Sequence, residues 1–415
     1  MMKIEEQLLK AKAASRELLL WSEERGNEIL YAVAERTEVC VASILEANAR
    51  DLERMDAADP RYDRLRLTEE RIAAIASDMR HVAQLPSLLG QELIHRTLPN
   101  GLELRRVRVP FGVIGVIYEA RPNVSFDVFS LCLKAGSACV LKGGSDAAET
   151  NAAIVGLIRS VLLELGLCAD VVTLLPPGRE AATALLEARG LVDVLIPRGS
   201  AGLIRTVRER AKVPVIETGA GVCHTYVDVA ARPEMAAAIV TNAKTRRVSV
   251  CNALDCILVH RDFTHLLSVC APLAEHRVLI YADETAYACL TGHYPADLLF
   301  HAEPEHYGRE FLSYALAIKT VDSLDTALAH IACYGSGHSE CIVTEDEFAA
   351  KRFEQLVDAA CVYVNAPTSF TDGAQFGMGA EIGISTQKLH ARGPMALEEM
   401  TTYKWLIRGA GQVRP

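Results

Sequence analysis

The sequence contains no long hydrophobic run. No stretch of its 415 residues reaches the roughly 18 uninterrupted apolar residues that a membrane-spanning helix needs. The amino-terminal segment, MMKIEEQLLKAKAASRELLLW, alternates charged and apolar residues and lacks the basic start, apolar centre and cleavage site of a signal peptide. These absences predict a cytoplasmic protein with no membrane partner.

An excess of positive charge and a clustered cysteine motif are also absent. The formal net charge is -10, which argues against nucleic acid or an anionic membrane as the main partner. The twelve cysteines are scattered singly, with no CxxC pair and no Cys/His cluster at zinc-ligand spacing. We therefore expect no disulfide framework, no metal site, and a reducing compartment in which most cysteines are small buried apolar residues.

The hydrophobic periodicity changes along the chain. Residues 3 to about 90 have the pattern of amphipathic helices, and residues 101–109 alternate apolar and charged side chains, as a half-exposed strand does. From residue 113 onward short apolar strands alternate with helices, which indicates parallel sheets covered on both faces. The expected strands are residues 113–118, 139–141, 171–174, 192–196, 213–216, 255–260, 315–320, 340–343 and 361–364. A break at residues 217–221 separates two α/β domains, and residues 401–413 are expected to be a further extended segment.

Two strand-to-helix turns are candidates for anion or nucleotide binding. Lys142 lies in VLKGGS, directly after a strand, and Gly199 and Ser200 lie in RGSAG, after another. Ligands of open α/β sheets bind at the carboxyl ends of strands, and a helix amino terminus favours an anion. Neither turn carries GxGxxG or a P-loop, so a solvated turn is the alternative at both.

Cys251 is the cysteine whose surroundings favour reactivity. It follows the basic stretch NAKTRRVSV and precedes an apolar strand, so Lys244, Arg246 and Arg247 would favour a thiolate if they lie close to it. The alternative is a thiol packed at the end of a strand, which is the commoner state of a cysteine.

Two polar residues stand at strand ends in positions suited to acyl chemistry. Asn123, in RPNV, can donate a hydrogen bond to a developing oxyanion or can simply cap a helix or form a turn. Glu217 ends a strand before a glycine-rich turn, where its carboxylate is either a base or solvated. The segment FGMGAEIGIS, residues 376–385, is too glycine-rich for a helix interior and is expected to wrap a site or to pack backbones closely.

Taken together, these segments resemble the aldehyde dehydrogenase superfamily and, within it, the γ-glutamyl phosphate reductases. The strings VPFGVIGVIYEARPNVSFD, VLKGGSDA and NAKTRRVSVCNALD carry the resemblance in this order, and GMGAEIGIST and ARGPMALEEMTTYKW extend it to nearly the whole chain. The resemblance implies an aldehyde dehydrogenase-like α/β fold with two doubly wound domains and a small β oligomerisation arm. It assigns residues 1–96 and 110–219 to a cofactor-binding domain, 97–109 and 401–415 to the arm, and 220–400 to a catalytic domain.

A catalytic role for three residues is implied by the same resemblance. Cys251 falls at the position of the nucleophile, and Asn123 at that of the asparagine that forms the oxyanion hole with the main-chain amide of the cysteine. Glu217 matches the glutamate that activates water in hydrolytic aldehyde dehydrogenases. A phosphate-using reductase must keep water off its thioester, so we expect Glu217 to point away from it or to act in another proton transfer.

The resemblance also implies a cofactor site. Lys142 matches the lysine that holds the cofactor ribose, Gly199 and Ser200 fall near the pyrophosphate, and Glu310 matches the glutamate that holds the nicotinamide ribose. Members that prefer NAD often carry a glutamate at the position of Ser145, where it would repel a 2′-phosphate. The neutral Ser145 therefore favours NADPH.

The implied reaction is the reduction of L-glutamyl 5-phosphate to L-glutamate 5-semialdehyde and phosphate, through a thioester on Cys251, in the second step of proline biosynthesis. Arg121 and Arg247 flank Asn123 and Cys251 in sequence and are expected to bind the anionic substrate, with exposed salt bridges as the alternative. The expected partners are further copies of the chain, in a dimer or larger assembly, and transiently the glutamate 5-kinase that makes the substrate.

Two alternatives of other classes remain open at this point. A hydrolytic, NAD-dependent aldehyde dehydrogenase would use Glu217 as its base and would not need phosphate. A non-catalytic scaffold of the same fold would need none of Cys251, Asn123 and Lys142, so their joint presence argues against it.

Overall fold

The computed structural model describes residues 2–57, 59 and 62–414, and the chain divides into two compact units. Unit 1 comprises Met1–Thr218, Gly377–Gly383 and Met395–Pro415, and unit 2 comprises Gly219–Phe376 and Ile384–Pro394. A short pair of strands, β14 (Gly383–Ser385) and β15 (Gly393–Met395), lies where the chain passes between the units.

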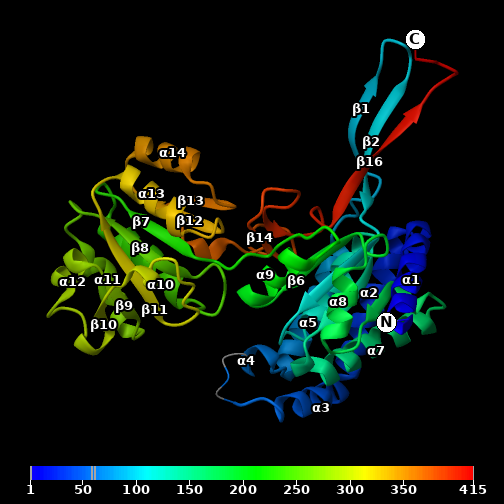
Figure 1. The fold of residues 1–415 in the computed structure, drawn as a ribbon, viewed down its shortest axis with the longest axis horizontal. Helices are drawn as coiled ribbons and strands as arrows, with labels where there is room; N and C mark the ends of the chain where they lie inside the picture. The colour runs from blue at the N-terminus through cyan, green and yellow to red at the C-terminus, as the bar shows by residue number, and fades with distance from the viewer. Residues whose placement is uncertain (1, 58, 60–61, 415) are drawn as a thin grey trace. The chain divides into compact units, whose positions relative to one another are not determined.

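Unit 1 is built around a four-stranded parallel sheet of order β5-β4-β3-β6 (Figure 1). Its strands are β3 (Val113–Tyr118), β4 (Ala138–Gly143), β5 (Val172–Leu174) and β6 (Val194–Arg198). Every residue of β3 and β4 is buried, as expected of strands covered on both faces. Tyr118 pairs in register with Gly143 on one side and with Arg198 on the other, so the carboxyl ends of three strands meet at one edge.

Helices form most of the rest of unit 1, as the sequence predicted for its first 90 residues. They are α1 (Met2–Glu17), α2 (Glu23–Val39), α3 (Val41–Leu52), α4 (Tyr62–Leu65), α5 (Glu69–Gln84), α6 (Val124–Lys134), α7 (Ala148–Glu164), α8 (Arg179–Leu186) and α9 (Ala201–Arg210). In the described part of both units, no helix is long and apolar enough to cross a membrane.

The predicted strand at residues 213–216 is wrong. A single isolated bridge between Leu195 and Val215 forms there instead. Pro214 has no N–H to donate to a neighbouring strand, and its carbonyl accepts from the N–H of Leu195. The segment therefore touches the edge of the sheet without continuing it.

A separate three-stranded antiparallel sheet of order β1-β2-β16 extends from the helices of unit 1 (Figure 1). It consists of β1 (Glu92–Thr97), β2 (Glu103–Pro110) and β16 (Thr401–Arg408). The sequence predicted β2 and the extended segment at β16 but missed β1. We call this sheet the arm.

Unit 2 contains a seven-stranded parallel sheet of order β10-β9-β11-β8-β7-β12-β13 (Figure 1). Its strands are β7 (Cys223–Val227), β8 (Leu254–His260), β9 (Leu279–Ala282), β10 (Leu299–His301), β11 (Ala315–Val321), β12 (Ser339–Val343) and β13 (Cys361–Val364). The helices of this unit are α10 (Pro233–Thr245), α11 (Leu266–Glu275), α12 (Glu284–Leu290), α13 (Leu324–Tyr334) and α14 (Glu347–Leu356). Apolar clusters pack on this sheet, one with α10 and α11 and the other with α13 and α14.

Candidate active site

Cys251 is half-buried and lies in the turn that connects α10 to β8. Lys244, near the end of α10, holds the base of this turn, because its Nζ donates to the carbonyl oxygen of Leu254 at 2.7 Å and lies 3.5 Å from Oδ1 of Asp255. Both side chains of this ion pair are almost fully buried. Lys244, which the sequence offered as an activator of the thiol, is thus paired with Asp255 at the start of β8.

Burial dominates the electrostatics of this pair. It lowers the pKa of Lys244 and raises the pKa of Asp255 to about 6, while the attraction between the two charges opposes both shifts. Asp255 is further bound by the N–H of Phe311, whose nitrogen lies 3.0 Å from Oδ1. The same carboxylate therefore fixes both the turn of Cys251 and the segment that carries Glu310.

His338 contacts the thiol of Cys251. Its Nε2 lies 3.2 Å from Sγ of Cys251, and its Nδ1 lies 2.8 Å from Oγ of Ser339. The hydroxyl oxygen of Ser339 lies 2.7 Å from Oγ1 of Thr371, and the same Oγ1 lies 2.7 Å from the hydroxyl oxygen of Tyr363. If Nδ1 carries the proton and donates to Ser339, this chain of hydroxyls leaves the lone pair of Nε2 directed at the thiol.

The imidazole of His338 is fully buried, and desolvation lowers its pKa to about 4. The ring is therefore neutral at neutral pH, so Nε2 can accept a hydrogen bond from the thiol, and a thiolate formed beside it would favour the protonated ring. A cysteine beside a neutral histidine is the arrangement of an activated nucleophile.

Gly221 is required by the close approach of the chain to Cys251. A Cβ atom at this position would lie 1.6 Å from the carbonyl oxygen of Cys251, a main-chain atom that cannot turn aside. The N–H of Gly221 donates to Oε1 of Glu310 at 3.1 Å. Gly221 thus brings together two residues that the sequence assigned to the site, Cys251 and Glu310.

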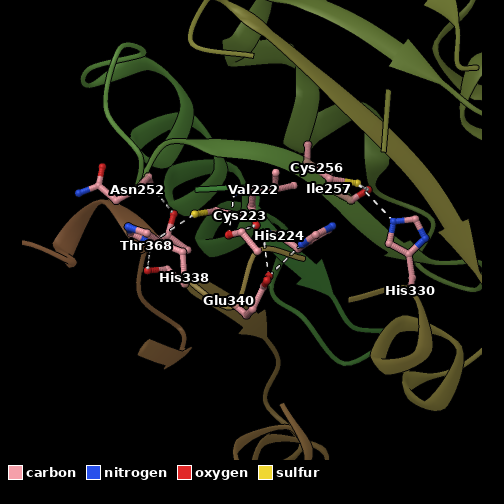
Figure 2. Close-up of polar contacts among 12 residues, drawn as sticks. Val222, Cys223, His224, Asn252, Cys256, Ile257, His330, His338, Glu340 and Thr368 are labelled. Atoms are coloured by element: carbon pink, nitrogen blue, oxygen red, sulfur yellow. Dashed lines mark hydrogen bonds and ion pairs between the residues drawn. The ribbon is translucent and has the colours of Figure 1, made fainter. Parts of the chain in front are cut away.

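The turn is anchored on its other side by Asn252. Its Nδ2 donates to the main-chain carbonyl of Thr371 at 2.9 Å. Its main-chain carbonyl accepts from Oγ1 of Thr368 at 2.8 Å. Cys223, at the start of β7, donates its thiol to the carbonyl of Cys251 at 3.3 Å. Figure 2 shows Cys223, Asn252, His338 and Thr368 grouped on one side of Glu340.

In unit 1, Asn123 follows β3 at the carboxyl edge of the four-stranded sheet. It occupies the N-cap position of α6, but its side chain makes no capping bond and donates instead from Nδ2 to Asp127 at 2.9 Å. Asp127 is half-buried, and desolvation raises its pKa to about 7. The amide of Asn123 is therefore held by a carboxyl group in unit 1, and its relation to Cys251 in unit 2 stays a prediction.

The predicted cofactor residues of unit 1 lie at the same edge of the sheet. Lys142 is buried in β4, where its Nζ donates to the carbonyl of Gly143 at 2.8 Å and desolvation lowers its pKa. Ser145 is exposed just beyond it. Gly199 and Ser200 form the turn between β6 and α9, with the hydroxyl of Ser200 accepting from the N–H of Leu203 as the N-cap.

The amino terminus of α9 already binds a carboxylate. The N–H of Ser200 donates to Oε2 of Glu119 at 2.8 Å, and a Cβ atom at Gly199 would lie 2.5 Å from the same oxygen. This geometry shows that the turn accepts an anionic oxygen close to its main chain. Glu119 was not identified from the sequence.

Three further residues are placed as follows. Glu217 lies 3.6 Å from a guanidinium nitrogen of Arg208, on α9. Arg121 is half-buried three residues after the end of β3, and Arg247 is exposed in the turn before Cys251. The two arginines belong to different units, so the structure does not test a shared substrate site.

The sequence analysis missed His338. A signal was present, because the histidine follows the turn Gly335-Ser-Gly337 and lies two residues before the strand predicted at residues 340–343. Its proximity to Cys251 nevertheless depends on β12 and β8 lying on either side of β7, which no local pattern encodes.

Comparison with known proteins identifies the family of the chain. The sequence profile described as the aldehyde dehydrogenase family matches residues 3–272. The γ-glutamyl phosphate reductase of Chlorobium luteolum is 59% identical over 413 residues, covering 99% of this chain and 98% of the relative. That of Bacteroides thetaiotaomicron is 59% identical over 404 residues, covering 97% of each chain.

A solved structure supports the same assignment. The crystal structure of γ-glutamyl phosphate reductase from Thermotoga maritima superposes with a TM-score of 0.94 at 38% identity, covering 99% of this chain and 100% of the other. The predicted aldehyde dehydrogenase-like α/β fold is confirmed. The chain therefore belongs to the aldehyde dehydrogenase family and, within it, to the γ-glutamyl phosphate reductases.

Proposed function

We propose that this enzyme catalyses the NADPH-dependent reduction of L-glutamyl 5-phosphate to L-glutamate 5-semialdehyde and phosphate, through a thioester on Cys251, as a step of proline biosynthesis. The observation that carries the proposal is the 3.2 Å contact between Sγ of Cys251 and Nε2 of His338. The full-length similarity to γ-glutamyl phosphate reductases supplies the substrate class.

The residues of unit 2 account for the covalent steps. Nε2 of His338 accepts the proton of Cys251, and the thiolate attacks the acyl carbon of the substrate. The bond between this carbon and the phosphate oxygen breaks, and phosphate leaves with the proton from His338. The product of this half-reaction is a thioester, which keeps the carbonyl group activated and bound to the enzyme.

A nicotinamide cofactor, when bound, would supply a hydride, and Cys251 would hold the reduced acyl carbon as a thiohemiacetal oxyanion. Collapse of this oxyanion breaks the bond between carbon and Sγ, releases the aldehyde and returns Cys251 as a thiolate. The main-chain amide of Cys251 and the side chain of Asn123 are proposed to stabilise the oxyanion at each stage. For the amide of Asn123 this role requires that its present acceptor, Asp127, be given up.

The residues present fit a phosphorylated dinucleotide. The N–H of Ser200 in the turn of Gly199 and Ser200 donates to the carboxylate of Glu119, and the turn would hold the pyrophosphate once this carboxylate is displaced. Lys142 and the exposed Ser145 would hold the adenosine ribose, and no acidic side chain occupies position 145 to repel a 2′-phosphate. Glu310, held by the N–H of Gly221 beside Cys251, would hold the nicotinamide ribose. In this proposal residues 1–96 and 110–219 bind the cofactor and 220–400 carry the chemistry.

The reverse reaction tests the proposal. With glutamate semialdehyde as the substrate, we expect reduction of NADP⁺ that depends on added phosphate and exceeds the reduction of NAD⁺. Cys251→Ala should abolish it, whereas Cys289→Ala, which removes an exposed thiol of the same unit, should leave it unchanged. Phosphate-dependent turnover that survives Cys251→Ala would contradict the thioester.

The hydrolytic alternative predicts a different result. It requires turnover without phosphate and a loss of that turnover in Glu217→Gln. The ion pair of Glu217 with Arg208 favours a carboxylate engaged in unit 1, in keeping with a reductase that protects its thioester from water. Phosphate-independent turnover of the wild type would transfer the assignment to the hydrolytic reaction.

A further inference from the structure

Four ionisable side chains gather in the core of unit 2, apart from the contact of Cys251 and His338. Cys256, His224 and Glu340 stand side by side on the adjacent strands β8, β7 and β12, because His224 pairs in register with both of the others. All three are completely buried. His330 reaches the same region from α13 and is half-buried. Figure 2 shows His224 extending toward the ring of His330, with Cys256 beside it.

Three of these side chains converge. One ring nitrogen of His224, Sγ of Cys256 and one ring nitrogen of His330 all lie within 4.8 Å of one another. The separation between Sγ of Cys256 and Nε2 of His330 is 4.0 Å. Two ligands on one zinc ion would be roughly 3.3–3.8 Å apart at the usual bond lengths. A small rotation of the partly exposed His330 would close the difference.

His224 is oriented as metal-bound histidines are. Its Nδ1 lies 3.0 Å from Oε2 of Glu340, and its main-chain N–H donates to the same oxygen at 2.8 Å. A carboxylate that accepts from one ring nitrogen fixes the tautomer and leaves the other nitrogen as a ligand. That other atom, Nε2 of His224, is fully buried and has no hydrogen-bond partner. Such an unpartnered polar atom in an apolar core requires an explanation, and a bound cation provides one.

The donor atoms suit a borderline-soft cation. Cys256 would lose its proton to solvent when a sulfur–metal bond forms. Lys319 is the cation nearest to the group and opposes metal binding, but its Nζ lies 3.8 Å from a carboxylate oxygen of Asp283. A thiolate, Glu340 and a divalent cation together sum to no net charge.

We infer that His224, Cys256 and His330 form a binding site for a divalent cation of borderline softness, with Zn²⁺ as its expected occupant and Glu340 as the residue that orients His224. Two nitrogens and one sulfur are a donor set that zinc and cobalt accept. The ion would enter past His330, the one member of the three that is partly exposed. The ion would link β7 and β8 to α13. Both strands begin near Cys251, because the thiol of Cys223 at the start of β7 donates to its carbonyl and β8 starts at Leu254.

The test uses the full chain with Cys251→Ser, which removes the thiol that lies 3.2 Å from the imidazole of His338. After chelation and dialysis, titration with Co²⁺ should give one equivalent of binding, with a thiolate-to-cobalt charge-transfer band that Zn²⁺ abolishes. Adding Cys256→Ser should remove the band. Adding His330→Ala should weaken binding by at least about tenfold, in the range seen when metal ligands or their supports are lost.

Controls separate loss of the site from loss of the fold. His330→Ala changes a partly exposed side chain, and its far-ultraviolet circular dichroism should match that of the parent. Cys289→Ser removes an exposed cysteine of the same unit and should keep both the band and the affinity. Absence of stoichiometric binding by the parent, or a band that persists in Cys256→Ser, would overturn the inference and leave Nε2 of His224 to a buried water.

Discussion

The contact between Cys251 and His338 depends on how each residue is held. Cys251 lies in a turn fixed by Asn252 on one side and by Gly221 on the other. His338 is fixed by the hydroxyl chain that begins at Ser339. Because other residues hold both partners, Cys251 and His338 can lie in contact while the thiol and the imidazole are both neutral.

Replacing His338 should lower the reactivity of Cys251. In His338→Asn the amide nitrogen can still donate toward Ser339, but the acceptor of the thiol proton is lost. We expect alkylation of Cys251 by iodoacetamide at pH 7 to slow by at least about tenfold and to recover only near the ordinary thiol pKa of about 8.5. The reductase activity, as kcat/KM, should fall by roughly 10²–10⁴-fold.

Peptide mass analysis of alkylated protein measures this prediction site by site. The exposed Cys289 provides an internal control whose rate should be equal in the two proteins. Equal rates at Cys251 in wild type and His338→Asn, across the pH range, would contradict a role of His338 in activating the thiol.

His338 should also make the stability of unit 2 depend on pH. Its pKa is about 4 in the folded protein and about 6.5 when unfolded, so between these values the unfolded chain binds the additional proton. Stability therefore rises with pH through this window and is lost on acidification. From pH 7 to pH 5 the free energy of unfolding of the wild type should therefore fall by about 2 kcal/mol more than that of His338→Asn.

The measurement is urea unfolding at the two pH values, followed by far-ultraviolet circular dichroism. Tryptophan fluorescence would not report on unit 2, because Trp21 and Trp405 both belong to unit 1. Contributions of other titrating groups appear in both proteins and cancel in the comparison. Parallel losses in wild type and His338→Asn would show that the buried ring does not titrate as inferred.

At the scale of secondary-structure elements, the buried pair of Lys244 and Asp255 joins the end of α10 to the start of β8. Lys244→Met leaves the carboxylate of Asp255 buried without its cation and should destabilise the protein by about 3–5 kcal/mol. The double variant Lys244→Met, Asp255→Asn removes the charge and keeps an oxygen for the N–H of Phe311, so it should recover much of this loss. Urea unfolding measures both.

An exposed pair in the same unit provides the matched control. Arg261 and Asp322 lie 2.7 Å apart with more than half of each side chain exposed, so Arg261→Met should change the stability by less than about 1 kcal/mol. A loss in Lys244→Met no larger than in this control would show that the buried pair does not hold the turn of Cys251.

The sequence predicted some strands correctly and others wrongly, and each outcome has a physical reason. The strand at residues 113–118 has the predicted bounds, because an unbroken apolar run is a local signal. β1 was missed because its residues Glu92–Thr97 mix charged and apolar side chains without a clean alternation. Residues 213–216 were overpredicted because their apolar content outweighed Pro214.

The candidate site shows the same limit. Cys251 and Glu310 were assigned through resemblance, and the structure brings both to Gly221. His338 and the group of His224, Cys256 and His330 were not found, because their members come from separate strands and a helix. Only the order of strands in the sheet places them together.

At the scale of the whole molecule, the arm indicates association between copies of the chain. β16 forms an edge of its sheet, and four of its apolar residues, Tyr403, Trp405, Leu406 and Ile407, are between 38% and 61% exposed. The guanidinium of Arg106 stacks on Tyr403 at 4.6 Å, which covers only part of this surface. An exposed apolar edge strand of this length is a template for pairing with another chain.

We expect the wild type to be a dimer or larger assembly, and Ile407→Lys to shift it toward the monomer. Leu389→Lys, which places the same charge at an exposed leucine of unit 2, should leave the assembly unchanged. Light scattering coupled to size-exclusion chromatography measures the mass of each. A wild type that is monomeric at every concentration, or equal dissociation in both variants, would contradict the role of the arm.

A single-turnover experiment tests the proposed thioester on Cys251 most directly. Semialdehyde and NADP⁺ are mixed rapidly with the enzyme in the absence of phosphate, and NADPH formation is followed by absorbance. We predict a burst equal to the concentration of active sites that then stops, restarts when phosphate is added, and is absent in Cys251→Ala. Continuous turnover without phosphate, or a burst that persists in Cys251→Ala, would contradict the account.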